Sequence, residues 1–175
     1  MPLVSFGVNH KTASLKTREC LVFDQERACS ALSYLIDLSL IQEGFILSTC
    51  NRTELYVSSD SPQVLLSWLR QHLAKYSFDI SSVGYVHRHD EVVKHLLRVS
   101  VGLESMVLGE SQILGQLKDA YFRAEKAGVA GAYFKRLMPS VFSIAKRIRS
   151  STDVGKNSVT ITSAVLQLVR QKFSD

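Results

Sequence analysis

Two short apolar runs flank a polar hexapeptide in the stretch Phe45-Ile46-Leu47-Ser48-Thr49-Cys50-Asn51-Arg52-Thr53-Glu54-Leu55-Tyr56-Val57. Residues 45–47 and 54–57 are rich in aliphatic and aromatic side chains, a composition typical of buried strands. The hexapeptide 48–53 is the most polar stretch up to this point of the chain, and it predicts a connecting loop. We therefore expect two consecutive strands around a polar loop.

Strand and helix signals alternate on both sides of this stretch. Residues 3–8 and 83–87 predict two more strands, and helices are expected to begin at Asp24, at Ser61-Pro62 and at Asp90, residues favoured at helix N-termini. The resulting order indicates an α+β fold, a ferredoxin-like antiparallel sheet with helices on one face. From Ser111 onward the strands stop, and helices over about 113–127, 132–151 and 157–175 predict an all-helical C-terminal segment.

The composition is that of a folded protein without membrane spans. Of 175 residues, 46% are hydrophobic and 21% are charged, and no window approaches the roughly 18 consecutive apolar residues of a membrane span. The N-terminus lacks the basic and apolar regions of a signal peptide, so a cytoplasmic protein is expected. Cys20, Cys29 and Cys50 are widely spaced and odd in number, which argues against a disulfide framework and against a zinc site.

The formal charge of +5 is unevenly distributed along the chain. Residues 1–115 contain 10 basic and 12 acidic side chains, whereas residues 116–175 contain 11 and 4. The basic C-terminal part predicts either a surface that meets a phosphate backbone or ordinary solvated helix faces, and charge alone does not decide between them.

Cys50 is the strongest candidate for a reactive group, because it lies in a polar loop directly after a strand. An unperturbed thiol is only about 3% ionised at neutral pH, so a nucleophilic cysteine needs a cationic neighbour. Arg52, two residues away, is suited to that role. The alternative is that Cys50 is a small buried hydrophobe. For Cys20 and Cys29 we expect packing roles only.

Two further features place polar groups next to apolar runs. His95 lies beside two leucines on an expected helix, where it is either a ligand-binding histidine or a satisfied core histidine. Residues 102–116 contain three glycines and several hydrogen-bonding side chains, with Gln112 and Gln116 on one helical face. This pattern suits recognition of a small zwitterionic group, and it also suits a helix-loop-helix joint with capping glycines.

Four sequence runs resemble those of a known family. They are Gly7-Val8-Asn9-His10-Lys11-Thr12-Ala13, Ser48 to Tyr56, Gly102 to Gln116, and Ala145-Lys146-Arg147-Ile148-Arg149. Together, in this order and at this spacing, they resemble the glutamyl-tRNA reductases, which start five-carbon tetrapyrrole synthesis. Ser111 and Val101 depart from the family's pattern, which commonly has proline and a small polar residue at these positions.

The resemblance implies a reaction and a set of site residues. Cys50 would attack the aminoacyl ester of glutamyl-tRNA(Glu), release the tRNA and hold glutamate as a thioester, and hydride from NADPH would then give glutamate-1-semialdehyde. His95 matches a family histidine that is important for activity. The residues implied to bind the glutamyl group are Thr49, Asn51, Arg52, Ser105, Glu110, Ser111, Gln112 and Gln116. Of these, Arg52 suits a bidentate carboxylate clamp, and Glu110 suits an anionic partner for the α-ammonium group.

The resemblance also implies parts that these residues do not supply. No Gly-x-Gly-x-x-Gly turn follows an expected strand, so we expect no NADPH site in this chain, and the family's cofactor domain would follow Asp175. We therefore expect a catalytic domain over residues 1–153 and a connecting helix over residues 154–175. For the full-length family, the resemblance further implies a homodimer, with glutamate-1-semialdehyde aminomutase as the downstream partner.

Two other functions fit the same residues. A non-catalytic tRNA-binding module would use the basic C-terminal helices, and Cys50 would be incidental to it. A cysteine hydrolase would pair Cys50 with His95, although no carboxylate that would orient the histidine is evident from the sequence.

Overall fold

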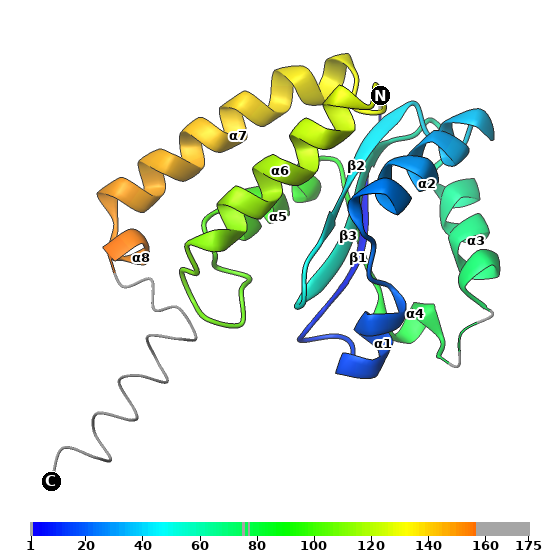
Figure 1. The fold of residues 1–175 in the computed structure, drawn as a ribbon, viewed down its shortest axis with the longest axis horizontal. Helices are drawn as coiled ribbons and strands as arrows, with labels where there is room; N and C mark the ends of the chain where they lie inside the picture. Colours follow the sequence, from blue (N-terminus) through cyan, green and yellow to red (C-terminus); the bar gives the residue numbers. More distant parts are fainter. Residues whose placement is uncertain (1, 75, 77, 157–175) are drawn as a thin grey trace, which may run out of the picture.

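The computed structural model describes residues 2–74, 76 and 78–156, which form four strands and eight helices (Figure 1). The strands are β1 (Leu3–Asn9), β2 (Glu43–Ser48), β3 (Arg52–Ser58) and β4 (Tyr85–Arg88). The helices are α1 (Leu15–Cys20), α2 (Gln25–Asp37), α3 (Pro62–Leu73), α4 (Ile80–Val83), α5 (Asp90–Ser100), α6 (Gln112–Lys126), α7 (Ala132–Ser151) and α8 (Asp153–Lys156). None of these described helices is long and apolar enough to cross a lipid bilayer.

The strands form one antiparallel sheet in the order β2-β3-β1-β4. β1 pairs with β3 from Leu3 opposite Ser58 to Asn9 opposite Arg52, and β2 pairs with β3 as a hairpin. This strand order is ferredoxin-like, so the fold class predicted from the sequence is confirmed. In the hairpin, Ser48 lies opposite Thr53, which places residues 49–51 in the turn.

Helices cover both faces of the sheet, which corrects the expectation of helices on one face. Apolar side chains alternate between the two faces of each strand, so both faces have to be covered. On one face, Ile46 and Leu55 line a cavity together with Leu35 of α2. On the other face, Phe45 packs edge-on against Phe134 of α7, with ring centroids 5.1 Å apart. Figure 1 shows α2 and α3 on one side of the sheet and α5, α6 and α7 on the other. The predicted helical C-terminal segment therefore folds back and forms a third layer.

Most helix ends follow the local signals in the sequence. The Asp24 carboxylate accepts the Arg27 N–H at 2.9 Å at the start of α2, and Pro62 is the first residue of α3. Gly128 follows α6 with a φ of +77°, and α7 spans the predicted residues 132–151.

Two boundaries differ from the prediction. Asp90 is not the N-cap of α5 but its first residue, and His89 occupies the cap position with a φ of +52°. The carboxylates of Asp90 and Glu91 therefore lie in the first turn, where the helix dipole favours negative charge. The strand predicted from Val83 begins two residues later, because Val83 ends the short helix α4.

Two further expectations concern a cysteine and the C-terminus. The packing role expected for Cys20 is wrong, because Cys20 is exposed at the end of the short helix α1, which the sequence pattern did not indicate. The helix predicted to begin at Asn157 lies outside the described residues. The domain division at residue 153 therefore stays a prediction.

A buried carboxylate joins α7 to the edge strand β2. Glu43 accepts the backbone N–H groups of Gly131, Tyr133 and Phe134 at 2.7, 3.0 and 3.2 Å. N–H groups at a helix start lack partners within the helix, and the helix dipole stabilises a negative charge there. Glu43 thus holds α7 on the sheet, at the end of β2 opposite the hairpin turn.

Candidate functional site

Cys50 lies in the β2–β3 hairpin turn and is exposed. The Thr49 hydroxyl oxygen accepts the N–H groups of Asn51 and Arg52, each at 3.2 Å, and the Thr49 N–H donates to the Arg52 carbonyl at 2.8 Å. From the end of β1, the His10 N–H donates to the Asn51 carbonyl at 2.9 Å. These bonds fix the backbone around Cys50 and leave the residue accessible.

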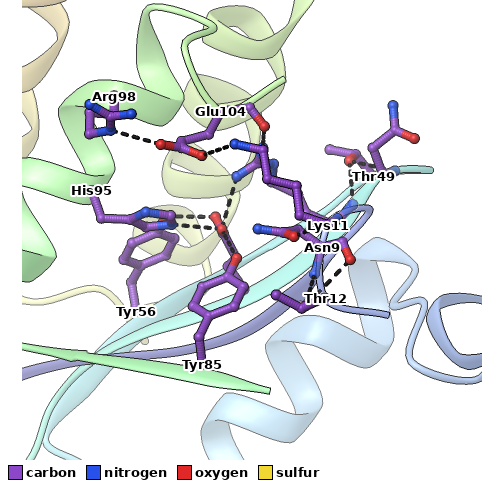
Figure 2. A network of polar contacts seen from close by, with 12 residues as sticks. Asn9, Lys11, Thr12, Thr49, Tyr56, Tyr85, His95, Arg98 and Glu104 are labelled. Atoms are coloured by element: carbon purple, nitrogen blue, oxygen red, sulfur yellow. Dashed lines mark hydrogen bonds and ion pairs between the residues drawn. The ribbon is translucent and has the colours of Figure 1, made fainter. Parts of the chain in front are cut away.

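Glu54 of β3 is the centre of a buried polar network. Figure 2 shows three of its partners, Tyr56, Tyr85 and His95, pointing toward one another. Its Oε1 accepts from Arg52 Nη1 at 2.9 Å and from the Tyr85 hydroxyl, and it lies 2.8 Å from His95 Nε2. Its Oε2 accepts from the Tyr56 hydroxyl at 2.7 Å. One carboxylate therefore ties together β3, β4 and α5, three residues after the end of the hairpin turn.

Burial and hydrogen bonding act in opposite directions on this carboxylate. Burial alone would raise the pKa of Glu54, but the hydrogen bond from His95 and the charge of Arg52 outweigh it and hold the pKa at about 2. Burial raises the pKa of Tyr56 and of Tyr85, and the Glu54 charge raises both further. Burial alone would lower the pKa of Arg52, but the Glu54 charge raises it. At neutral pH the network holds an ionised Glu54, a charged Arg52 and two protonated tyrosines.

A second carboxylate, Glu104, extends the network toward solvent. It accepts from Lys11 Nζ and from Arg98 Nε, each at 2.7 Å, and its backbone carbonyl accepts from Arg52 Nη2. Burial alone would raise the pKa of Glu104, but the hydrogen bonds from Lys11 and Arg98 lower it to about 2. Figure 2 shows Lys11 and Arg98 approaching Glu104 from opposite sides. Glu104 thus connects α5 and the segment after β1 to the buried Arg52.

Aromatic rings surround His95. Its ring centroid lies 4.4 Å from that of His87, 5.5 Å from that of Tyr85 and 6.5 Å from that of Tyr56. Burial, followed by the proximity of His95, lowers the pKa of His87. Burial and neighbouring cationic side chains also lower the pKa of His10, whose buried Nδ1 has no hydrogen-bond partner among the described residues. The lowered pKa values of His87 and His10 favour the neutral form of both rings.

The loop between α5 and α6 carries Ser105 and Glu110. Gly102 and Gly109 adopt φ values of +84° and +77°, which favour glycine, and the Gly109 N–H donates to the Gly102 carbonyl at 3.0 Å. Arg149 of α7 donates to the carbonyls of Gly109 and Glu110, each at 3.3 Å. The Ser105 hydroxyl oxygen is buried without a hydrogen-bond partner among the described residues, so a ligand group could satisfy it.

The structure brings together part of the predicted site. Thr49, Cys50 and Asn51 share the hairpin turn, and Arg52 connects that turn to His95 through Glu54. Ser105 directly follows Glu104, whose carbonyl binds Arg52.

The predicted residues at the start of α6 lie apart from this network. Ser111, Gln112 and Gln116 are exposed. Gln116 lines a cavity of about 260 Å³, together with Ser48 at the end of β2 and Asp24 before α2.

Arg52 differs from the free carboxylate clamp that the sequence indicates. Its side chain is 1% exposed, and both terminal nitrogens already bind groups of the protein. A substrate carboxylate would have to displace the Glu104 carbonyl, so the clamp stays a prediction.

Sequence reasoning missed Glu54, and with it the carboxylate that contacts His95. The signal was nevertheless present, because Arg52, Glu54 and Tyr56 alternate along β3 directly after a polar turn and must share one face of the strand. What the sequence did not indicate is that α5 packs on this face and brings His95 to the carboxylate.

An apolar cavity of about 280 Å³ lies on the opposite face of the sheet, with Phe6, Leu55 and Trp68 in its lining. None of the site residues predicted from the sequence is among the described residues that line it. We place the candidate site at the hairpin and the Glu54 network, because charged and hydrogen-bonding groups converge there.

The described residues fit neither a metal ion nor a dinucleotide. Across residues 2–74, 76 and 78–156, no three His, Cys, Asp or Glu side chains are grouped closely enough to hold a metal. A dinucleotide's pyrophosphate needs a glycine-rich turn between a strand and a helix. Here the described strand-to-helix connections, residues 10–14, 59–61 and 89, contain no glycine.

The fold and the site define an α+β domain built around a cysteine-bearing hairpin and a buried Arg-Glu-His network. The family profile described as "Glutamyl-tRNAGlu reductase, N-terminal domain" matches residues 6–152. The chain therefore belongs to the glutamyl-tRNA reductase family, and the resemblance of the four sequence runs is confirmed.

Individual relatives agree with the family profile. Glutamyl-tRNA reductase from Coxiella burnetii is 47% identical over 174 residues, which cover 99% of this chain and 42% of the relative. The enzyme of the same name from Pseudomonas aeruginosa is 43% identical over 177 residues, 100% of this chain and 42% of the relative. The solved structure of glutamyl-tRNA reductase from Methanopyrus kandleri superposes with a TM-score of 0.75 at 30% identity, covering 97% of this chain and 39% of that one. The chain thus spans about two fifths of the length of these relatives.

Proposed function

We propose that Cys50 accepts the glutamyl group of glutamyl-tRNA(Glu) as a thioester, and that this chain is the part of a glutamyl-tRNA reductase that carries out this transfer. One observation carries the proposal: in a chain of this family, the exposed cysteine sits on a hairpin turn that is anchored to a buried Arg52-Glu54-His95 network. Nucleophilic catalysis needs an accessible thiol on a backbone that is held in place, and the hydrogen-bonded turn supports both.

The proposed step is a redox-neutral acyl transfer. The Cys50 sulfur attacks the ester carbonyl carbon, the C–S bond forms, and the bond between the carbonyl carbon and the tRNA ribose oxygen breaks. The thiol proton is passed to the departing ribose oxygen, so the products are the thioester and free tRNA. Water could later attack the thioester and release glutamate, which makes the chain a slow esterase.

Several residues are proposed to bind the glutamyl group. The buried and unpartnered Ser105 hydroxyl supports binding at the α5–α6 loop. A separate cavity, which Gln116 lines together with Ser48 at the end of β2, supports binding beside the start of the hairpin turn. Glu110 is the proposed partner of the α-ammonium group, and Arg52 that of a carboxylate. The other members of the set are Thr49, Asn51, Ser111 and Gln112.

The proposal extends to the complete reaction of the longer relatives. Reduction of the thioester to glutamate-1-semialdehyde needs a hydride, which NADPH supplies. Because the described residues do not fit a dinucleotide, we assign them no step that involves it. A cytoplasmic homodimer that hands its product to glutamate-1-semialdehyde aminomutase completes the proposal.

Trapping of the intermediate tests the transfer. Glutamyl-tRNA(Glu) carrying radiolabelled glutamate is mixed with the chain, quenched in acid and mapped by proteolysis. We expect hydroxylamine-sensitive label on the Cys50 peptide and none in Cys50→Ser. Cys20→Ser is the matched control, because Cys20 is also an exposed free thiol, and it should label normally. Thioester label that persists in Cys50→Ser would refute the assignment.

A cysteine hydrolase is the second candidate, and the Glu54–His95 contact favours it by supplying the orienting carboxylate. Such an enzyme would cleave simple glutamate esters in a single turnover as fast as it cleaves glutamyl-tRNA. A reductase domain would strongly prefer the tRNA ester. The third candidate, a non-catalytic tRNA-binding module, predicts equal iodoacetamide reactivity at Cys50 and Cys20.

A further inference from the structure

The Glu54 carboxylate is surrounded by groups that donate hydrogen bonds. Arg52 Nη1 and the two tyrosine hydroxyls take three of its four contacts, and His95 Nε2 takes the fourth at 2.8 Å. An ionised carboxylate only accepts hydrogen bonds. His95 Nε2 must therefore carry a proton and donate it to Oε1.

The charge balance determines the state of the second ring nitrogen. Arg52 already compensates the charge of Glu54, and both side chains are at most 1% exposed. A charged His95 would leave a net positive charge buried in this cluster, against the stacked ring of His87 at 4.4 Å. A neutral ring protonated on Nε2 has its lone pair on Nδ1, and among the described residues the hydrogen bond of the His95 ring is the one between Nε2 and Glu54.

We propose that Glu54 is a positioning residue that holds His95 as the neutral Nε2–H tautomer and so keeps Nδ1 as the one ring nitrogen able to accept a proton. This inference rests on the proposed acyl transfer, in which the thiol proton has to move to the ribose oxygen. The arrangement inverts the usual serine-protease geometry, where the carboxylate binds Nδ1 and leaves Nε2 as the base.

Four side chains from two strands surround the His95 ring. From β3 they are Glu54 and Tyr56, and from β4 they are Tyr85 and His87. The rings limit rotation of the imidazole, so the Glu54 contact alone selects which nitrogen is protonated. Glu54 thereby serves two functions, since the same Oε1 also pairs with Arg52 next to the hairpin turn.

The tautomer can be measured directly by nitrogen chemical shifts of a ¹⁵N-histidine-labelled chain at neutral pH. We expect His95 to show a protonated Nε2 and an unprotonated Nδ1. An imidazolium, or a neutral ring protonated on Nδ1, would overturn the proposal. This measurement needs no substrate, so it is independent of whether the thioester forms.

A pair of isosteric variants tests the consequence for the reaction. Glu54→Gln keeps the shape of the side chain and removes the charge, and we expect thioester formation to slow by about 100-fold or more, with a second His95 tautomer becoming detectable. Glu43→Gln is the matched control, because Glu43 is also a buried carboxylate on the sheet but binds only backbone N–H groups of α7. It should lower stability while leaving the His95 shifts and the thioester rate within about twofold.

The outcomes separate the two proposals. A rate loss in Glu54→Gln with His95 shifts identical to those of the unaltered chain would reduce Glu54 to a structural role and refute the inference. Absence of thioester in the unaltered chain, with the expected tautomer present, would refute the acyl transfer and leave the state of His95 established. If Glu54→Gln fails to fold, the spectrum of the unaltered chain still decides the tautomer.

Discussion

Glu54 and Glu104 differ in burial, and solvent therefore screens the ion pairs of their carboxylates to different extents. Glu54 is fully buried, and every neighbour of its oxygens is a fixed donor. Glu104 is partly exposed and pairs with Lys11 and Arg98, whose side chains are about half exposed, at 54% and 49%. Solvent screens the outer pairs and not the inner one. Glu104 is therefore the residue whose charge can be removed without endangering the fold.

Replacement of Glu104 by glutamine should lower stability in a pH-dependent way. The pKa of Glu104 is about 2 in the folded protein, compared with 4.5 for the free side chain. Its charge therefore stabilises the fold above about pH 4.5, and this contribution is lost as the pH falls toward 2. Allowing for screening, we expect Glu104→Gln to cost about 1 kcal/mol at pH 7 and almost nothing at pH 2, measured by urea unfolding.

A surface acid provides the control for this measurement. Glu91 forms an exposed pair with Lys94 at 3.5 Å, so Glu91→Gln should change the unfolding free energy by no more than about 0.5 kcal/mol at either pH. If Glu104→Gln lowered the free energy of unfolding equally at pH 7 and pH 2, the loss would come from packing. That result would contradict a stabilising role of the Glu104 charge.

At the scale of elements, Gly7 of β1 leaves space for the side chains of Glu54 and Tyr85. A Cβ on Gly7 would lie 2.7 Å from Glu54 Cγ and 3.0 Å from the Tyr85 ring. Gly7→Ala should therefore force Glu54 or Tyr85 away from its partners, at a cost of about 1–3 kcal/mol, and slow thioester formation as well. Urea unfolding and the trapping assay measure the two effects.

Gly115 of α6 is the matched control, because nothing lies within 4 Å of a Cβ added there. Gly115→Ala should stabilise the protein by about 0.5–1 kcal/mol, as alanine does in an exposed helix interior, without changing the thioester rate. If Gly7→Ala behaved like Gly115→Ala, the close approach of β1 to Glu54 would be refuted.

Elements were predictable from the sequence wherever a local signal marks them. Asp24, Pro62 and Gly128 mark helix ends through capping and backbone preference, and those ends are found where expected. The hairpin turn was also predictable locally, because a polar stretch between two apolar runs marks it. The Glu54 network joins positions 41 residues apart, and its formation depends on which face of the sheet α5 covers. No local pattern encodes that choice, so the sequence offered His95 as a candidate but not its partner.

At the scale of the whole molecule, the basic charge is gathered on the helices of the third layer. α7 contains five basic residues and no acidic one. Lys135 and Arg136 precede Lys146 and Arg147 by 11 residues, so the two pairs lie on nearly the same helix face, about 16 Å apart along the axis. All four residues are exposed. Two cationic pairs at this separation suit contacts to successive parts of a nucleic-acid backbone.

For the proposed binding of tRNA(Glu), this charge distribution predicts contact through α7. Removal of two phosphate contacts by Lys146→Gln/Arg147→Gln should weaken binding of tRNA(Glu) and reduce the slope of log Kd against log salt by about 1.5, since each contact contributes about 0.7–0.9. The control is Arg27→Gln/Arg70→Gln, which removes the same charge from exposed positions on α2 and α3, across the sheet from α7 (Figure 1). Fluorescence anisotropy over a range of salt concentrations measures both variants. The control should keep the slope of the unaltered chain. If only the net charge mattered, the two double variants would reduce the slope equally. Equal slopes would therefore show that α7 makes no specific phosphate contacts.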